Sequence, residues 1–437
     1  MLNKPKSFFN WGRNVKICPN HIKPKNMMEL KKVVKKKSFI TSGNQRSFGD
    51  VALNDKSIVS MRNFNKIIHF NTKKGIIELQ SGILLKEVLP IILEKGWIFP
   101  VTPGTKYVSM GGMVANNIHG KNTKKNQIKF YVKKIKLLTL NKKIVSCTLK
   151  NNKKIFDLTV GGFGLTGIIL SVTIQLKKIT SFYLKQNIEE FSTYTEFFNS
   201  AKKINNFQYS VSWVDRFTDS KISGLWFFSN HININKSYTQ FKGFNEKKIG
   251  IIYYLILALI VNNNFFSRLS NYFYKTYKKL FYKKIVQYDE YFYPQDYLIN
   301  WNKAYGKKGM FQIQFLVSEK KFKDILSQIH LFFIDEGMFS SFIVIKKINE
   351  KGKYLNFAGT GYSVSLDFTI NSKFNLLKNF LNKIVKENKL KVNFAKDFIS
   401  NESIALNYKE FKEFKSGLRT INKKKIINSS FSKRINI

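Results

Sequence analysis

The chain has 437 residues, of which 43% are hydrophobic and 15% aromatic. This length exceeds one ordinary domain core, and this composition excludes a disordered chain. The formal net charge of +48 raises the hypothesis of nucleic-acid binding. The excess positive charge is almost entirely lysine, however, and it is spread along the chain. A genome rich in A and T produces this pattern, so we expect no nucleic-acid partner. Such a charge should still attract anionic membranes or phosphorylated substrates.

Residues 23–120 alternate short helical stretches with β-rich runs. The apolar periodicity predicts a helix at 27–37 and another at 84–96, which ends at a glycine. Strands are predicted at 38–41, 58–60, 67–70 and 75–79. No GxGxxG lies between a first strand and a helix, so this mixed α+β arrangement differs from a dinucleotide-binding Rossmann fold.

Beyond residue 179 the glycine clusters stop and aromatic residues become frequent. Helices are predicted at 319–336 and 373–388. Strands are predicted at 209–214, 224–229, 312–317, 342–346 and 363–368. This alternation predicts an antiparallel sheet that is covered by helices.

The stretch 232–284 gives the weakest signal for regular structure and is interpreted as a mobile cover over a site. Within it, the apolar run 249–261 is shorter than the roughly 20 residues that span a bilayer. We favour a buried helix or a flexible flap over peripheral membrane contact, because the run has no evident polar face.

The chain has two cysteines, Cys18 and Cys147, and neither belongs to a CxxC pair or a His/Cys cluster. We therefore expect neither a disulfide framework nor a metal site. The first residues hold no apolar run long enough for a signal peptide. These observations predict a cytoplasmic protein, with peripheral contact at the inner membrane left open.

Three glycine-rich segments carry the clearest chemical signal. They are SGNQRSFGD (42–50), PVTPGTKYVSMGGMVANNIHGKN (100–122) and TVGGFGLTGII (159–169). Each follows a predicted strand and places glycines where a loop backbone can approach another group closely. Together they predict a cradle whose backbone N–H groups bind the phosphates of a large cofactor.

These segments resemble the FAD-binding domain of the vanillyl-alcohol-oxidase/p-cresol-methylhydroxylase (PCMH-type) superfamily and, within it, the decaprenylphosphoryl-ribose 2-oxidase branch. QRSFGD, NNIHGKN and GGFGLTGII carry the resemblance, and residues 291–315 and NFAKDF (393–398) resemble that branch's substrate domain. The resemblance implies an α+β fold with a two-lobed FAD-binding domain over 1–178, completed by 391–437. Residues 179–390 would then form the substrate-binding domain.

The resemblance also implies which residues contact FAD. The first segment contains no histidine that could tether the flavin, so non-covalent FAD is expected. Asn44 and Gln45 replace a Leu-Gly pair that is common in the branch. The implied FAD contacts are Thr41, Ser42, Gly43, Asn44, Gln45, Arg46, Ser47, Phe48, Gly49, Asp50, Val51, Gly104, Ser109, Met110, Gly111, Gly112, Asn116, Asn117, Ile118, His119, Ile168 and Asn393.

Two residues are the candidates for catalysis. Oxidation of a secondary alcohol needs hydride transfer to the flavin and loss of the hydroxyl proton to a base or a polarising cation. Lys396 in NFAKDF is the leading candidate through the resemblance, although most lysines are surface residues. His119 in NNIHGK is the second, although a lone histidine is usually structural.

The resemblance assigns sugar or phosphate contacts to a further set of polar residues. Ser365 stands where actinobacterial members carry cysteine, and hydride transfer needs no thiol. The glutamines would equally suit a strand face exposed to solvent. The implied substrate contacts are Lys121, Gln312, Gln314, Lys346, Ser365 and Lys396.

Three functions are weighed. The favoured one is an FAD enzyme that oxidises the 2-hydroxyl of a polyprenyl-phosphate-linked ribose for cell-envelope synthesis, with an NAD(P)H-dependent short-chain reductase as partner in an epimerisation. The alternative is an aldonolactone oxidase of the D-arabinono-1,4-lactone type acting on a free sugar lactone. The third is a basic nucleic-acid-binding or membrane-surface protein without catalysis, which predicts a colourless protein.

Overall fold

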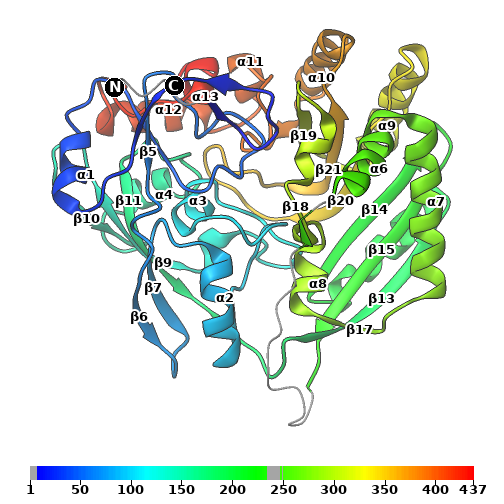
Figure 1. Cartoon of the computed structure of the whole chain (residues 1–437), viewed down its shortest axis with the longest axis horizontal. Coiled ribbons are helices and arrows are strands. Elements are labelled where there is room, and N and C mark those ends of the chain that lie inside the picture. Colours follow the sequence, from blue (N-terminus) through cyan, green and yellow to red (C-terminus); the bar gives the residue numbers. More distant parts are fainter. Residues whose placement is uncertain (1–6, 234–246, 249) are drawn as a thin grey trace.

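The computed structural model describes residues 7–233, 247–248 and 250–437. Two lobes lie side by side (Figure 1). One lobe combines N-terminal residues with the C-terminal helices, and the other is built on an eight-stranded sheet. The C-terminal helices are α11 (Glu402–Ala405), α12 (Phe411–Ile421) and α13 (Ser430–Arg434).

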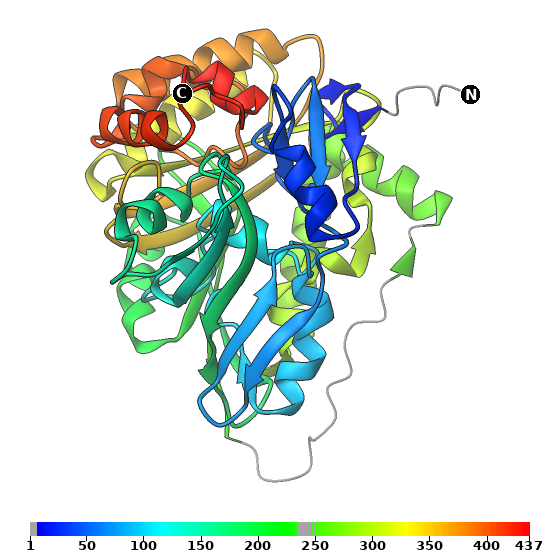
Figure 2. The ribbon, with the colours of Figure 1, turned by 90° about the vertical axis from the view of Figure 1, so that its left-hand side faces the viewer.

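A parallel three-stranded sheet begins the first lobe. Its order is β3 (Asn20–Ile22), β5 (Ser57–Ser60) and β4 (Ile40–Ser42). Leu30 of α1 (Met27–Val33), Ile58, Phe414 and Phe431 share one buried core, so the end of the chain packs into its beginning. Figure 2 shows the red C-terminal helices at the top of this lobe. The first glycine-rich segment starts where β4 ends, which fixes its position at the sheet edge.

A five-stranded antiparallel sheet forms the rest of this lobe. In β7, Ile77 and Leu79 are buried while Glu78 between them is not, so the period-2 alternation directs one face to the core. Helices α2 (Leu85–Glu94) and α3 (Met110–Ala115) contribute to that core, and α4 (Lys153–Thr159) precedes the third segment. The strand order is β10 (Ile144–Cys147), β9 (Val132–Leu138), β11 (Ile168–Gln175), β7 (Ile76–Gln80) and β6 (Ile67–Asn71).

The second lobe is an eight-stranded sheet in which every neighbouring pair is antiparallel. Helices α5 (Tyr194–Lys202), α9 (Glu319–Asp335) and α10 (Phe374–Glu387) cover one face. The strand order is β17 (Ile285–Gln287), β13 (Tyr183–Phe191), β15 (Ile222–His231), β14 (Tyr209–Phe217), β20 (Phe342–Asn349), β21 (Thr360–Thr369), β19 (Met310–Val317) and β22 (Lys391–Val392).

The two faces of this sheet differ in chemistry because side chains alternate along each strand. Phe311, Ile313 and Phe315 of β19 pack under the helices. Gln312 and Gln314 point the other way, towards the first lobe, where they line a cavity. The sheet therefore contributes both a hydrophobic core and a polar wall.

The α+β fold and the helix-covered antiparallel sheet are confirmed. Every strand and helix predicted from the sequence has a counterpart in the structure. The ends shift by a few residues, as at α1, which stops at Val33 rather than at residue 37. The division into two domains at the stated residues stays a prediction.

The expectation that 232–284 lacks regular structure is wrong for the part that the structure describes, whereas its role as a mobile cover stays a prediction. Residues 234–246 and 249 lie outside the described residues. The remainder forms helices α6 (Ile251–Asn262) and α7 (Asn264–Leu280). The predicted buried helix at 249–261 is also wrong, since Ile251 is 77% and Ile252 69% exposed. Apolar composition alone does not reveal which surface remains uncovered.

Candidate active site

A cavity of about 420 Å³ lies between the two lobes. The three glycine-rich segments form its wall on the first lobe. The polar face of the eight-stranded sheet and the loop 393–396 form the opposite wall. These parts lie far apart in the sequence, and the fold brings them together around one cavity.

Glycine is required where the first two segments meet. A Cβ built on Gly43 would lie 1.9 Å from Oγ of Ser109, and one on Gly111 would lie 2.8 Å from Cβ of Ser81. A side chain at Gly43 would collide with Ser109 of the second segment, and one at Gly111 would collide with Ser81, which lies outside the three segments. The first two segments therefore contact each other closely at this end of the cavity, which we call the slot.

Several buried polar atoms in this slot have no partner among the residues that the structure describes. They are Oγ of Ser42, Nε2 of Gln45, Oγ of Ser81 and Oδ1 of Asn116, and all four residues line the cavity. Because a buried polar group without a hydrogen bond is costly, such atoms indicate a polar ligand. The donors and acceptors suit the phosphates and ring edges of a dinucleotide.

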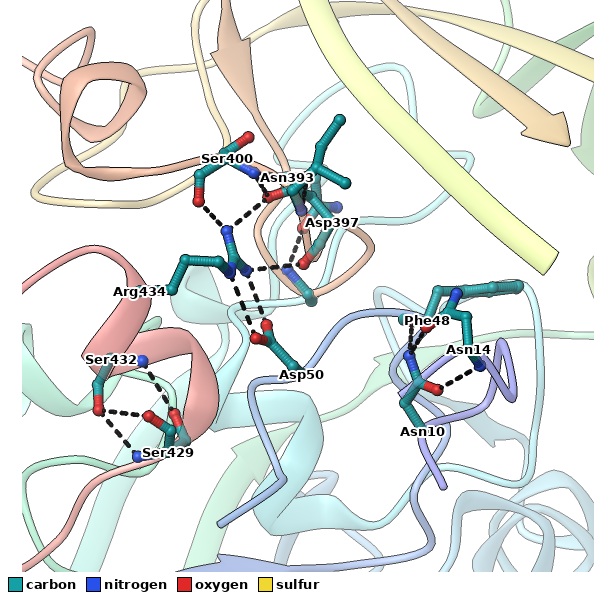
Figure 3. A network of polar contacts seen from close by, with 12 residues as sticks. Asn10, Asn14, Phe48, Asp50, Asn393, Asp397, Ser400, Ser429, Ser432 and Arg434 are labelled. Carbon is teal, nitrogen blue, oxygen red and sulfur yellow. Dashed lines mark hydrogen bonds and ion pairs between the residues drawn. The ribbon is translucent and has the colours of Figure 1, made fainter. Parts of the chain in front are cut away.

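Arg434 of α13 connects the first segment to the loop that carries Lys396 (Figure 3). Its Nη2 lies 2.7 Å from Oδ1 of Asp50, and its Nη1 lies 3.3 Å from Oδ2 of Asp397. The guanidinium also donates to the carbonyl oxygen of Ser400. The backbone N–H of Gly49 donates to the carbonyl of Ala395 at 3.1 Å. The cofactor wall and the lysine loop are therefore held as one unit.

Lys396 is buried at the cavity wall. Its backbone N–H donates to the carbonyl of Asn393 at 2.9 Å, and the Asn393 side chain donates to Oε1 of Gln314 at 2.7 Å, which fixes the loop on β19. Burial lowers the pKa of Lys396 to about 8, and the nearby Asp367 carboxylate limits the decrease. A lysine with this pKa can exchange a proton near neutral pH.

Asp367 is the acidic partner of this lysine and was missed at the sequence level. Nε2 of Gln312 donates to Oδ1 of Asp367 at 2.5 Å. Burial raises the pKa of Asp367 to about 7, although Gln312 and Lys396 oppose the increase. The alternation in YSVSLDF places Ser363, Ser365 and Asp367 on one face of β21, a signal that could have revealed it.

His119 is buried between these groups and the second segment. Burial, with the Lys346 and Lys396 ammonium groups, lowers the pKa of His119 to about 3. The imidazole is therefore neutral at ordinary pH. Its Nε2 lies 3.3 Å from Oε1 of Gln314, which already accepts from Asn393, so Nε2 is the donor and Nδ1 is left as an acceptor.

Lys121 and Lys346 add two more cations to the cavity wall. Burial lowers the pKa of Lys121 to about 7. Burial also lowers that of Lys346 to about 7, and the neighbouring Lys396 and Lys121 contribute in the same direction. Nζ of Lys346 lies 3.4 Å from the carbonyl of Gly120, and Nζ of Lys121 donates to the carbonyl of Tyr291. Neither has a carboxylate within ion-pair distance among the described residues.

The fold gathers most of the predicted site residues around this cavity. The predicted residues that line it are Thr41, Ser42, Gly43, Asn44, Gln45, Arg46, Ser47, Phe48, Val51, Gly104, Ser109, Gly111, Gly112, Asn116, Asn117, Ile118, His119, Lys121, Gln312, Gln314, Lys346, Ser365, Asn393 and Lys396.

Four expected cofactor contacts lie behind the cavity wall instead. Met110 and Ile168 are fully buried in hydrophobic cores. Asp50 pairs with Arg434, and Gly49 packs on the carbonyl of Asp397. These four residues belong to or adjoin the glycine-rich segments, but none of them lines the cavity.

Aromatic residues that sequence reasoning missed also line the cavity. Trp213 belongs to β14, Tyr274 to α7 and Trp301 to the turn 301–305, while Trp11 lies in the turn that follows residue 9. The Arg46 guanidinium lies 3.9 Å from the centre of the Trp11 ring, a cation–π contact. Trp301 lies within the segment 291–315 noted from the sequence, whereas no local motif surrounds the other three.

Residues 21–148 match the family described as FAD binding domain. A decaprenylphosphoryl-beta-D-ribose oxidase of Mycolicibacterium smegmatis is 26% identical over 390 residues, covering 84% of this chain and 83% of that protein. The L-gulonolactone oxidase of Bos taurus is 26% identical over 185 residues, 41% of this chain and 42% of that protein. A putative D-arabinono-1,4-lactone oxidase of Neurospora crassa is 24% identical over 174 residues, 39% and 31% of the two chains.

The chain is an FAD-dependent oxidoreductase. The unsatisfied polar atoms of Ser42, Gln45, Ser81 and Asn116 on the cavity wall fit this cofactor. FAD supplies a flavin ring that accepts a hydride when it is bound. Lys396, His119 and the polar face of the sheet line the same cavity.

Proposed function

We propose that this oxidoreductase acts on the 2-hydroxyl of a ribose carried by polyprenyl phosphate, in cell-envelope polysaccharide synthesis. The observation that carries the proposal is the convergence of three partly buried lysines, Lys121, Lys346 and Lys396, on one cavity. The similarity to a decaprenylphosphoryl-beta-D-ribose oxidase over most of both chains supports it.

The charge of the substrate follows from the state of these lysines. Burial lowers the pKa of Lys121, and burial together with the Lys396 and Lys121 ammonium groups lowers that of Lys346, so an anion between them would be stabilised. A phosphodiester supplies that negative charge. A sugar lactone is neutral and leaves the repulsion in place.

The oxidation removes a hydride from the sugar carbon and a proton from its hydroxyl oxygen. Lys396 in its neutral form accepts the hydroxyl proton, and the adjacent Asp367 sets its pKa. Nδ1 of His119 accepts a hydrogen bond from the sugar and orients it. Gln312 and Ser365 offer further contacts from the same sheet face. The product is a keto sugar that remains linked to the lipid.

A second enzyme has to use this product. Reduction of the keto group from the opposite face would invert the carbon and complete an epimerisation, which calls for an NAD(P)H-dependent short-chain reductase as partner. We place both steps in the cytoplasm, with peripheral contact at the inner membrane. Supply and removal of a lipid-linked sugar favour that location.

Oxidation of a free aldonolactone is the alternative, because two lactone oxidases are among the relatives. Anaerobic mixing distinguishes the two. A polyprenyl-phosphoryl ribose should bleach the flavin absorbance, while gulono- and arabinono-lactones should leave it unchanged. The reverse pattern would replace the proposal by the alternative.

The lysine pair provides a matched test of substrate charge. Lys121→Gln with Lys346→Gln should raise KM for the phosphorylated substrate at least about tenfold, since removing buried charge partners weakens anion binding. Lys386→Gln with Lys383→Gln on the exposed surface of α10 is the control. An unchanged KM in the cavity variant would contradict a role of these lysines in phosphate binding.

A further inference from the structure

Helix α6 exposes a continuous apolar surface. Its inner side packs Leu257, Ala258 and Val261 into a small core with Trp301 and Tyr305. The outer side chains are aliphatic or aromatic and largely exposed. They are Ile251 (77%), Ile252 (69%), Tyr253 (70%), Leu255 (56%), Ile256 (49%) and Leu259 (52%).

Helix α7 is amphipathic, with its apolar side turned outward. Its inner side makes polar and aromatic contacts: Asn271 donates to the carbonyl of Asp215 at 3.3 Å, and the Tyr274 ring lies 4.8 Å from that of Trp213. The outer side chains repeat at helical spacing and form one stripe. They include Phe265 (69%), Tyr272 (65%), Phe273 (60%), Tyr277 (53%) and Leu280 (72%).

The two helices form an L with a bend of 109°. In the part of the chain that the structure describes, no single helix is long and apolar enough to cross a bilayer. The two helices have the required length and apolar composition only when they are taken together. Two short helices joined at such an angle are better suited to lie along a membrane surface than to cross it. We call their exposed apolar residues the α6–α7 face.

The charged side chains of α6, α7 and the residues that follow, up to Lys284, are all positive. No Asp or Glu occurs between Glu246 and Asp289. Lys275 and Lys279 lie beside the apolar stripe, where each contacts Glu190 of β13 at 2.5 and 2.6 Å. The cations on or after α7 are Arg268, Lys275, Lys278, Lys279, Lys283 and Lys284.

We propose that the α6–α7 face binds the surface of an anionic lipid bilayer. Exposed aliphatic and aromatic side chains enter the boundary between headgroups and acyl chains, while the flanking lysines meet the anionic headgroups. A second copy of the chain is disfavoured as the occupant, because a two-fold contact would place two cationic surfaces against each other.

The position of this face has a consequence for the cavity. Tyr274 and Lys278 of α7 line the cavity from the inner side of the same helix, and Trp301 beneath α6 lines it as well. A lipid-linked substrate would therefore reach the cavity from the bilayer without crossing water. This step rests on the proposed function, whereas binding to the bilayer does not.

Vesicle flotation of the flavin-loaded protein tests the proposal. We expect the protein to float with vesicles of phosphatidylglycerol and phosphatidylethanolamine and to bind pure phosphatidylcholine far less. The triple variant Phe265→Ser, Phe273→Ser and Leu280→Ser should bind vesicles at least about tenfold more weakly, because each substitution removes apolar area that the bilayer would bury. Leu331→Ser with Ile334→Ser on α9, which are 53% and 61% exposed, is the matched control and should bind like the unaltered protein.

Retained flavin absorbance verifies that each variant is folded. Equal flotation of the α6–α7 variant and the control would overturn the proposal. A second result would overturn it as well. In that result the unaltered protein does not bind vesicles and is a dimer in analytical ultracentrifugation, whereas the α6–α7 variant is a monomer. Anaerobic flavin bleaching with substrate is measured separately, so failure of the proposed function and failure of bilayer binding give different results.

Discussion

Arg434, three residues from the end of the sequence, lies 2.7 Å from Asp50 in the first glycine-rich segment. Both side chains are largely buried, and the same guanidinium reaches Asp397 beside Lys396 (Figure 3). One cation thus holds the first glycine-rich segment against the loop that carries Lys396. The geometry of the site depends on a residue that does not line it.

Replacing Arg434 by methionine should lower the free energy of unfolding by about 3–5 kcal/mol, because two buried carboxylates lose their cation. FAD should also dissociate more easily, since the first segment is released. Thermal unfolding and flavin fluorescence measure both effects. The neighbouring Lys433→Gln removes an exposed pair with Asp55 and should cost less than about 1 kcal/mol. Similar losses of unfolding free energy in the two variants would contradict the role of Arg434 in holding the two segments together.

Replacing Lys396 by methionine should leave FAD bound and slow substrate-driven flavin reduction by about 10²–10⁴-fold, the usual range for loss of a general base. Stopped-flow absorbance gives the rate. Lys386→Met on the exposed surface of α10 is the control and should reduce at the normal rate. If the flavin of the Lys396 variant is reduced as fast as that of the control, Lys396 is not the general base.

The rate of flavin reduction should rise with pH and level off above about 8, because Lys396 accepts a proton only after its ammonium has lost one. The Asp367 carboxylate stabilises that ammonium, so Asp367→Asn should lower the pKa of Lys396 and shift the rise to lower pH. Pre-steady-state rates across the pH range measure the shift. A shift to higher pH would contradict the assignment of Lys396 as the base.

Acid precipitation should release the flavin into the supernatant, because the first segment has Arg46, Ser47 and Phe48 and no histidine that could tether it. Absorbance of supernatant and pellet decides the outcome. Flavin that stays with the pellet after denaturation would contradict non-covalent binding.

The glycine-rich segments and NFAKDF could be predicted from the sequence because local spacing fixes their backbone geometry. The cavity residues of β19 and β21 follow from strand alternation once the faces are known, as for Gln312 and Ser365. Arg434 could not be predicted, since its partner Asp50 lies 384 positions away. The outward apolar face of α6 could not be predicted either, because an apolar helix gives the same pattern when it is buried.

The absorbance of the purified protein during anaerobic titration with a polyprenyl-phosphoryl ribose tests most directly whether it is an FAD-dependent oxidoreductase of this substrate. We expect a yellow protein whose flavin bands disappear on addition of this substrate and persist with gulono- and arabinono-lactones. A colourless protein that takes up no FAD would contradict the assignment as an FAD-dependent oxidoreductase. A yellow protein bleached only by lactones would contradict the proposed substrate.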